Sequence, residues 1–258
     1  MITIDLSGKT ILITGALGAI AEYVVRKLAM AGATLILADI KSDETARETL
    51  HSWQIPDSPH VYLSADITDP DAMDRLVQKS FESFPRLDTV LGHAGGCRLH
   101  PFATTSKEEY ESIFRFNYFA QTFLARAVLA QWTRRKIQGH LIFTSSYVAR
   151  APHTQLPAYA SAKAALENFT KCLALEYSSA GIRVNAISPG NVAAGSSVKN
   201  FDESLAYREF VKRVSPMGKR NSPEAIGDAF AFLCSPMANE INGQVLSVDF
   251  GIGIGFQL

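Results

Sequence analysis

The feature that most constrains the fold is an alternation of short runs rich in Ile, Leu and Val with longer segments of helical periodicity. Such an alternation is typical of a parallel sheet built from βαβ units. The predicted strands are residues 10–14, 34–39, 61–66, 88–95, 139–146, 182–190 and 244–251. We therefore expect an α/β fold: a single doubly wound domain over residues 1–258, with a seven-stranded parallel sheet flanked by helices on both faces.

Some of the intervening helices begin at recognisable signals. Asp69 and Ser222 are each followed by proline, so each is suited to be an N-cap with proline at the first helical position. Two other predicted helices, 110–132 and 157–177, are apolar in almost every direction, although packing on a sheet requires only one apolar face. The second apolar face predicts contact with another subunit, and hence a homo-oligomer.

The least regular part of the chain follows the sixth predicted strand. Residues 187–201 are rich in Gly, Ser and Ala, and a predicted helix with apolar residues at helical spacing comes next. Ligands of open parallel sheets bind beyond the carboxyl ends of the strands, which is where this segment begins. We therefore expect a flexible substrate flap at about residues 190–215.

The composition argues against several classes of function. Lys and Arg total 25, Asp and Glu also total 25, and no basic run occurs, so neither nucleic acid nor an anionic membrane is predicted as a partner. No apolar run approaches the roughly 18 residues that span a bilayer. Cys97, Cys172 and Cys234 lie far apart, without metal-binding or redox spacing. We expect a cytoplasmic protein with a small-molecule ligand and no metal.

A glycine-containing turn follows the first predicted strand. The sequence "TGALGAIA" at residues 14–21 connects that strand to a helix, where backbone N–H groups can hold a pyrophosphate. Asp39 ends the second predicted strand, from which a carboxylate can bind the adenosine ribose hydroxyls of NAD. By themselves, these residues also fit a tight turn without a ligand and a cap for the following helix.

Tyr159 and Lys163 lie four residues apart on the predicted helix 157–177, so they share one face. The plain interpretation is a surface pair. The functional interpretation is an acid/base group, because an ammonium ~4 to 5 Å away stabilises a phenolate by about 3 to 4 kcal/mol at an effective dielectric near 20. Such a neighbour is expected to lower the tyrosine pKa.

With these motifs in place, the chain resembles the short-chain dehydrogenase/reductase family over nearly all of its length. Asn117 in "FRFNYFAQ" and Ser146 at the end of "HLIFTSS" join Tyr159 and Lys163 in the order and spacing of the family's catalytic tetrad. The resemblance implies a Rossmann fold, hydride transfer between a secondary alcohol and a ketone, and dimers or tetramers. It also implies that Ser146 holds the substrate oxygen, Tyr159 is the acid/base, Lys163 binds the nicotinamide ribose and Asn117 helps to hold a proton-relaying water.

The resemblance further implies a set of residues that bind NAD. They come from the glycine turn, the end of the second strand and the segments "ADITD", "GHAG" and "SPGNV". They are Gly15, Leu17, Gly18, Ala19, Ile20, Asp39, Asp66, Ile67, Ala94, Gly95, Pro189, Gly190 and Val192, together with Tyr159 and Lys163. NAD is predicted over NADP because the carboxylate of Asp39 would repel the extra phosphate of NADP.

Several positions depart from the family pattern. Ala19 stands where glycine is usual, Gly92 and His93 where Asn-Asn is usual, Ala194 where threonine is usual, and Phe250 where glycine is usual. For His93, a hydrogen-bonded histidine at a strand end is favoured over a metal or catalytic role. The departures keep open the alternative of a non-catalytic nucleotide-binding regulator with this fold.

The substrate is the least constrained part of the prediction. Polar residues in loops are expected to border the pocket and to favour a sugar, a polyol or a hydroxy acid, although surface solvation explains them equally well. They are Arg98, His100, Arg150, His153, Gln155 and Lys199. The rival enzyme is a 3-oxoacyl-thioester reductase that uses NADPH.

Overall fold

The computed structural model describes residues 3–55 and 60–255, so the expected domain over 1–258 includes residues outside the described ranges. The strands are β1 (Thr10–Thr14), β2 (Thr34–Asp39), β3 (Val61–Ser64), β4 (Thr89–Gly92), β5 (His140–Thr144), β6 (Arg183–Pro189) and β7 (Val245–Val248). They form one seven-stranded sheet in the order β3-β2-β1-β4-β5-β6-β7, and every pair is parallel. The predicted doubly wound sheet is confirmed, and its strand order reverses between β1 and β4.

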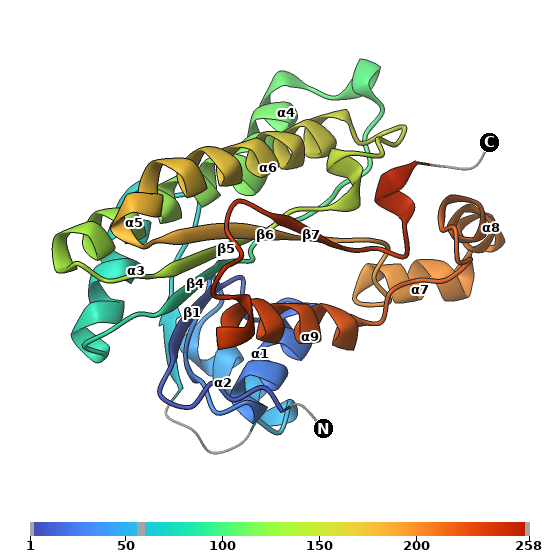
Figure 1. Cartoon of the computed structure of the whole chain (residues 1–258). Helices are drawn as coiled ribbons and strands as arrows, with labels where there is room; N and C mark the ends of the chain where they lie inside the picture. The colour runs from blue at the N-terminus through green and yellow to red at the C-terminus, as the bar shows by residue number, and fades with distance from the viewer. Residues whose placement is uncertain (1–2, 56–59, 256–258) are drawn as a thin grey trace.

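Helices cover both faces of this sheet (Figure 1). Their bounds are α1 (Ala21–Met30), α2 (Asp43–Ser52), α3 (Pro70–Ser83), α4 (Lys107–Phe114), α5 (Ala120–Arg135), α6 (Pro157–Tyr177), α7 (Ser196–Glu203), α8 (Leu205–Val214) and α9 (Pro223–Cys234). Alternate residues along each strand pack into two hydrophobic cores, one on each face of the sheet. Leu12 and Ile36 pack towards α3, α5 and α6, whereas Ile11 and Leu35 pack towards α1 and α9.

Both predicted helix starts are confirmed. Asp69 caps α3 by accepting a hydrogen bond from Asp71 N at 2.9 Å, and Ser222 caps α9 by accepting one from Ala225 N at 3.2 Å. Each helix has proline in its first turn. These caps are local interactions, which is why the sequence identifies them.

The predicted helix over 110–132 is not one continuous α-helix. A π-helical turn at Arg115–Phe119 separates α4 from α5 and carries Asn117 at its centre. The side-chain amide of Asn117 donates to Ile113 O at 3.0 Å within this turn. Turns of this kind occur mostly as interruptions of α-helices, frequently at functional sites.

The helices α7 and α8 follow β6 and lie beyond the carboxyl ends of the strands (Figure 1). The chain after β7 returns to the same side of the molecule (Figure 1). Among the described residues, none of the helices is both long and apolar enough to cross a membrane. The flexibility expected of residues 190–215 stays a prediction.

Candidate active site

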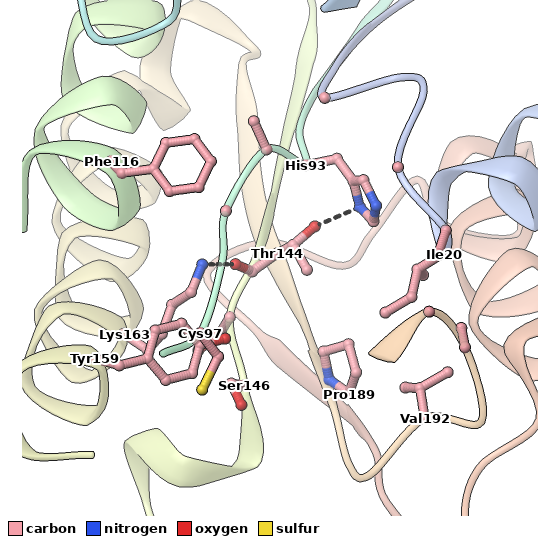
Figure 2. Close-up of a pocket in the computed structure, with 18 of the residues that line it drawn as sticks. Ile20, His93, Cys97, Phe116, Thr144, Ser146, Tyr159, Lys163, Pro189 and Val192 are labelled. Carbon is pink, nitrogen blue, oxygen red and sulfur yellow. Dashed lines mark hydrogen bonds between the residues drawn. The ribbon is translucent and has the colours of Figure 1, made fainter. Parts of the chain in front are cut away.

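A cavity of about 660 Å³ lies at the carboxyl ends of the strands. Its size is typical of small-molecule sites. The lining includes every site residue predicted from the sequence except Leu17 and Asn117, which are buried beneath it. Figure 2 shows how Tyr159, Lys163 and Ser146 on one side face Ile20, Pro189 and Val192 on the other.

The glycine turn has the geometry that a pyrophosphate requires. Gly15 adopts φ +67°, and a Cβ there would lie 2.7 Å from Ala94 Cα. Ile20 is the N-cap residue of α1, and its side chain makes no capping hydrogen bond. Within the described residues, the N–H groups of Ala19 and Ile20 have no hydrogen-bond partner, and both residues line the cavity. The free donors and the positive helix end fit a dinucleotide phosphate.

Asp39 belongs to the same end of the cavity. Its Oδ2 accepts a hydrogen bond from Leu17 N at 3.1 Å, and its side chain lines the cavity. The alternative that Asp39 caps the following helix is wrong, because Ser42 caps α2. The side chain of Leu17 is buried in the core, so Leu17 reaches this site through its backbone.

Asn117 is a buried amide that holds the loop after β4. Its Oδ1 accepts from Gly96 N and its Nδ2 donates to Gly96 O, both at 3.0 Å. The same loop packs against Lys163, since a Cβ on Gly95 would lie 3.1 Å from Lys163 Nζ. Asn117 therefore positions backbone next to the lysine, and its expected role in a water relay stays a prediction.

Tyr159 and Lys163 are not a surface pair. Lys163 is 2% exposed, its Nζ lies 5.7 Å from the centroid of the Tyr159 ring, and it donates to Thr144 O at 2.7 Å (Figure 2). Burial lowers the pKa of Lys163 to about 8. Thr144 therefore supplies the polar contact that the buried ammonium requires.

The expected lowering of the tyrosine pKa is not found in the protein by itself. Burial raises the pKa of Tyr159, and a hydrogen bond with Ser146 opposes that rise. Desolvation of the phenolate is the largest cause of this rise, and the Lys163 ammonium is directed to Thr144 O. The phenol is consequently a proton donor at neutral pH.

His93 matches the hydrogen-bonded interpretation. Its Nδ1 lies 2.9 Å from Thr144 Oγ1 (Figure 2), and its ring packs edge-on against Phe230. Burial lowers the pKa of His93 to about 4, so the ring is neutral. In the described part of the chain, no cluster of three or more His, Cys, Asp or Glu side chains is arranged to hold a metal ion.

The sequence reasoning missed Gln121, which explains the glycine at 92. A Cβ on Gly92 would collide with Gln121 Oε1 and would lie 2.8 Å from Phe143 Cδ1. Gln121 Nε2 donates to Ala94 O at 2.7 Å and so holds the cavity wall. The sequence signal that could have found it was an uncharged polar residue on a largely apolar helix.

The segment after β6 contacts the glycine turn. Gly195 adopts φ +57°, and a Cβ there would lie 3.2 Å from Ala19 Cβ. The methyl group of Ala19 thus faces both the cavity and this segment. Phe250 is another position where glycine is usual in the family. It adopts φ +53°, a left-handed conformation that glycine reaches without strain.

The expectation that six polar loop residues border the pocket is wrong for their side chains. Arg98, His100, Arg150, His153, Gln155 and Lys199 are all absent from the described lining. Arg150 instead lies 3.5 Å from Glu167 Oε2, and His153 contacts Tyr147 OH at 2.7 Å. The loops reach the cavity through neighbouring residues such as Cys97, Val148 and Leu156, and not through these six polar residues.

Together, the sheet, the glycine turn and the Ser–Tyr–Lys group in the cavity define an oxidoreductase with a Rossmann fold that uses NAD(H) or NADP(H). The family model described as enoyl-(acyl carrier protein) reductase matches residues 15–253. The chain belongs to the short-chain dehydrogenase/reductase family.

Individual proteins resemble the chain over almost its whole length. It is 32% identical to 3β-hydroxysteroid dehydrogenase 1 of Eggerthella lenta, over 98% of this chain and 97% of that protein. It is 30% identical to glucose 1-dehydrogenase of Gluconobacter oxydans, over 95% of this chain and 92% of that protein. The crystal structure of levodione reductase superimposes with a TM-score of 0.87 at 25% identity, covering 96% of this chain and 98% of that one.

Proposed function

We propose that this protein is an NAD-dependent oxidoreductase that interconverts a secondary alcohol and a ketone. The observation that carries the proposal is the convergence of Ser146, Tyr159 and Lys163 on the cavity that also contains the glycine turn and Asp39. A proton-transfer group and a dinucleotide cradle in one cavity support hydride transfer between two bound molecules.

In this mechanism, Tyr159 exchanges a proton with the substrate oxygen, and Ser146 holds that oxygen by a hydrogen bond. When bound, the nicotinamide accepts the hydride from an alcohol or supplies it to a ketone. The raised pKa of Tyr159 suits it to protonate a ketone oxygen, whereas alcohol oxidation needs nearby positive charge to favour the phenolate. Lys163 contributes that charge, and Asn117 keeps the adjacent loop in place.

Binding of the cofactor is proposed along the length of the cavity. The N–H groups of Ala19 and Ile20 would hold the pyrophosphate. The adenosine end, lined by Asp39, Asp66 and Ile67, would hold the ribose and the base. Lys163 is the one Lys or Arg in the described lining, so no lining cation offsets the repulsion between Asp39 and an NADP phosphate. This charge distribution supports NAD.

The relatives support the reaction type without selecting a substrate, because one is named for a hydroxysteroid and another for glucose. We also propose a cytoplasmic homo-oligomer, a dimer or tetramer. The helix α6 and the π-turn before α5 expose large apolar side chains, including Leu175 at 81% and Phe119 at 45%. Contact between such faces in two subunits would cover them.

Replacement of Tyr159 tests the reaction. Tyr159→Phe should bind NADH but lose at least about a hundredfold in kcat, because the general acid/base is removed. NADH absorbance would be followed with polyols, sugars, hydroxy acids, simple ketones and acyl thioesters. Tyr177→Phe, at the end of the same helix, is the matched control.

Activity of Tyr159→Phe within a few-fold of the unmodified enzyme would contradict the assigned role. NADH binding without turnover of any compound would instead indicate a non-catalytic nucleotide-binding protein.

A further inference from the structure

The cavity has a substrate end with mostly apolar walls. We define the substrate end by Cys97, Tyr147, Val148, Leu156 and Tyr207, which line the cavity around Ser146 and Tyr159. Val148 and Leu156 are buried in a small cluster, separate from the two main cores, against which Tyr159 packs. A ligand that reaches Tyr159 would therefore meet aliphatic side chains and tyrosine rings.

The hydroxyl groups at the substrate end already have partners in the protein. Tyr147 OH lies 2.7 Å from His153 Nε2. Tyr207 OH donates to Asn191 Oδ1 at 3.2 Å and accepts from Asn191 Nδ2 at 2.9 Å. These pairs reduce the donors and acceptors that are free for a polyol, so some of its hydroxyls would lack partners here, which costs binding free energy.

No free charge is available to an anionic substrate in the described lining. Asp39 and Asp66 lie at the adenosine end. Lys163 donates to Thr144 O at 2.7 Å, and burial holds the pKa of His93 at about 4. Cys97 is exposed by its accessible surface, and partial desolvation of its thiol by the cavity wall raises the pKa to about 11. Cys97 lies beside Tyr159 and Ser146 (Figure 2) and interacts with Tyr159 as a neutral, weakly polar group.

From these three observations we infer that the substrate is an uncharged, largely hydrocarbon secondary alcohol or ketone; this inference rests on the proposed function. In oxidation, the carbinol C–H bond breaks and its hydride passes to NAD. The hydroxyl proton passes to the phenolate form of Tyr159, whose own proton has first been released to solvent, and a C=O bond forms. The hydrocarbon groups on either side of the reacting carbon contact Val148, Leu156 and the tyrosine rings.

Two matched pairs of alcohols test the inference. Cyclohexanol and myo-inositol share a six-membered carbon ring and differ in hydroxylation. Methyl 3-hydroxybutyrate and 3-hydroxybutyrate differ in one negative charge. With saturating NAD, kcat/KM should be at least about tenfold higher for the first member of each pair, because the polar member buries groups without partners.

Binding gives a readout that does not depend on turnover. Titration of the Tyr159→Phe variant in its complex with NADH, in which turnover is suppressed, is followed by nucleotide fluorescence and should show cyclohexanone binding at least about tenfold more tightly than acetoacetate. Equal or tighter binding of acetoacetate would overturn the inference. So would equal or faster turnover of myo-inositol or 3-hydroxybutyrate, although that result would leave the proposed function intact.

Substitutions at Leu156 test the same inference by changing the cavity wall instead of the substrate. Leu156→Gln makes one wall polar at similar volume, whereas Leu156→Met keeps it apolar. The glutamine variant should reduce the ratio of cyclohexanol to myo-inositol kcat/KM by at least about threefold, and the methionine variant should preserve that ratio. Melting curves and NADH binding establish that each variant is folded.

An unchanged ratio in a folded, NADH-binding Leu156→Gln variant would contradict the inference. If the unmodified protein binds NADH and turns over none of the four alcohols or the wider panel, the proposed function fails and the inference falls with it.

Discussion

The two ends of the cavity differ in how they are built. At the adenosine end, the site is formed by backbone conformation and one carboxylate. Gly15 brings the turn close to Ala94, the residues Ala19 and Ile20 have free N–H groups, and Asp39 lies at the end of a strand. At the substrate end, side-chain surfaces such as Leu156 define the shape. The adenosine end therefore tolerates few substitutions, whereas the substrate end tolerates exchange of one apolar side chain for another.

This difference explains which parts of the site can be predicted from the sequence. A backbone that must turn left-handed or approach a phosphate requires glycine at a fixed place, so it leaves a motif. A hydrocarbon wall requires only apolar side chains of the right volume, and these are not distinguishable from ordinary core residues.

The largest expected effect tests the backbone requirement at the adenosine end. Gly15→Ala should weaken NADH binding by at least about thirtyfold, roughly 2 kcal/mol, because the new Cβ falls 2.7 Å from Ala94 Cα at a residue with φ +67°. Fluorescence titration with NADH measures the loss.

Gly8→Ala is the control that separates the effect of backbone strain from the effect of the close approach to Ala94. Gly8 has φ +76°, but a Cβ there would meet nothing within 4 Å beyond its chain neighbours, so this variant should lose about 1 kcal/mol of stability and bind NADH normally. Similar NADH affinities for the two variants would show that the approach to Ala94 is unimportant for the cofactor.

A smaller effect tests the carboxylate. The unmodified enzyme should prefer NAD over NADP by about tenfold in kcat/KM, equivalent to about 1.4 kcal/mol. Asp39→Ala should shrink this ratio mainly by improving the use of NADP, since like-charge repulsion is removed. Steady-state kinetics with both nucleotides decide the matter, and equal use of NADP by the unmodified enzyme would mean that Asp39 does not control the choice.

The smallest effect belongs to the substrate end. Tyr207→Phe should lower kcat/KM for a hydrocarbon alcohol by less than about threefold, because its hydroxyl is paired with Asn191 rather than offered to a ligand. Thermal unfolding should show a loss of about 1 kcal/mol for the broken pair. A tenfold or greater loss of activity would mean that the phenol contacts substrate directly and that the two ends are more alike than described.

The fold was largely predictable because its signals are local. Seven apolar runs, with caps such as Asp69 and Ser222, specify strands and helix starts without reference to distant residues. The π-turn around Asn117 was not foreseen, because the amide that bridges Ile113 and Gly96 acts across two separate segments.

The site was predictable in part for the same reason. Most of the residues that the motifs identified line one cavity, but Gln121 escaped notice because its partners, Gly92 and Ala94, come from another strand end. The loop residues were misassigned because polarity does not determine side-chain direction. The pKa of Tyr159 was misjudged because it depends mainly on burial, a tertiary property that the four-residue spacing to Lys163 does not reveal.

The pairing of Asn191 with Tyr207 has a consequence for how such an enzyme changes during evolution. Asn191 follows β6 and is 8% exposed, while Tyr207 lies on α8, so the two residues occupy separate segments of the chain. Mutation of either one leaves a buried polar group of the other without its main partner, at a cost of about 1 to 3 kcal/mol. Acquiring a preference for hydroxylated substrates therefore takes two coordinated mutations, and lineages that carry this pair should change their choice of hydrocarbon more readily than they change to sugars.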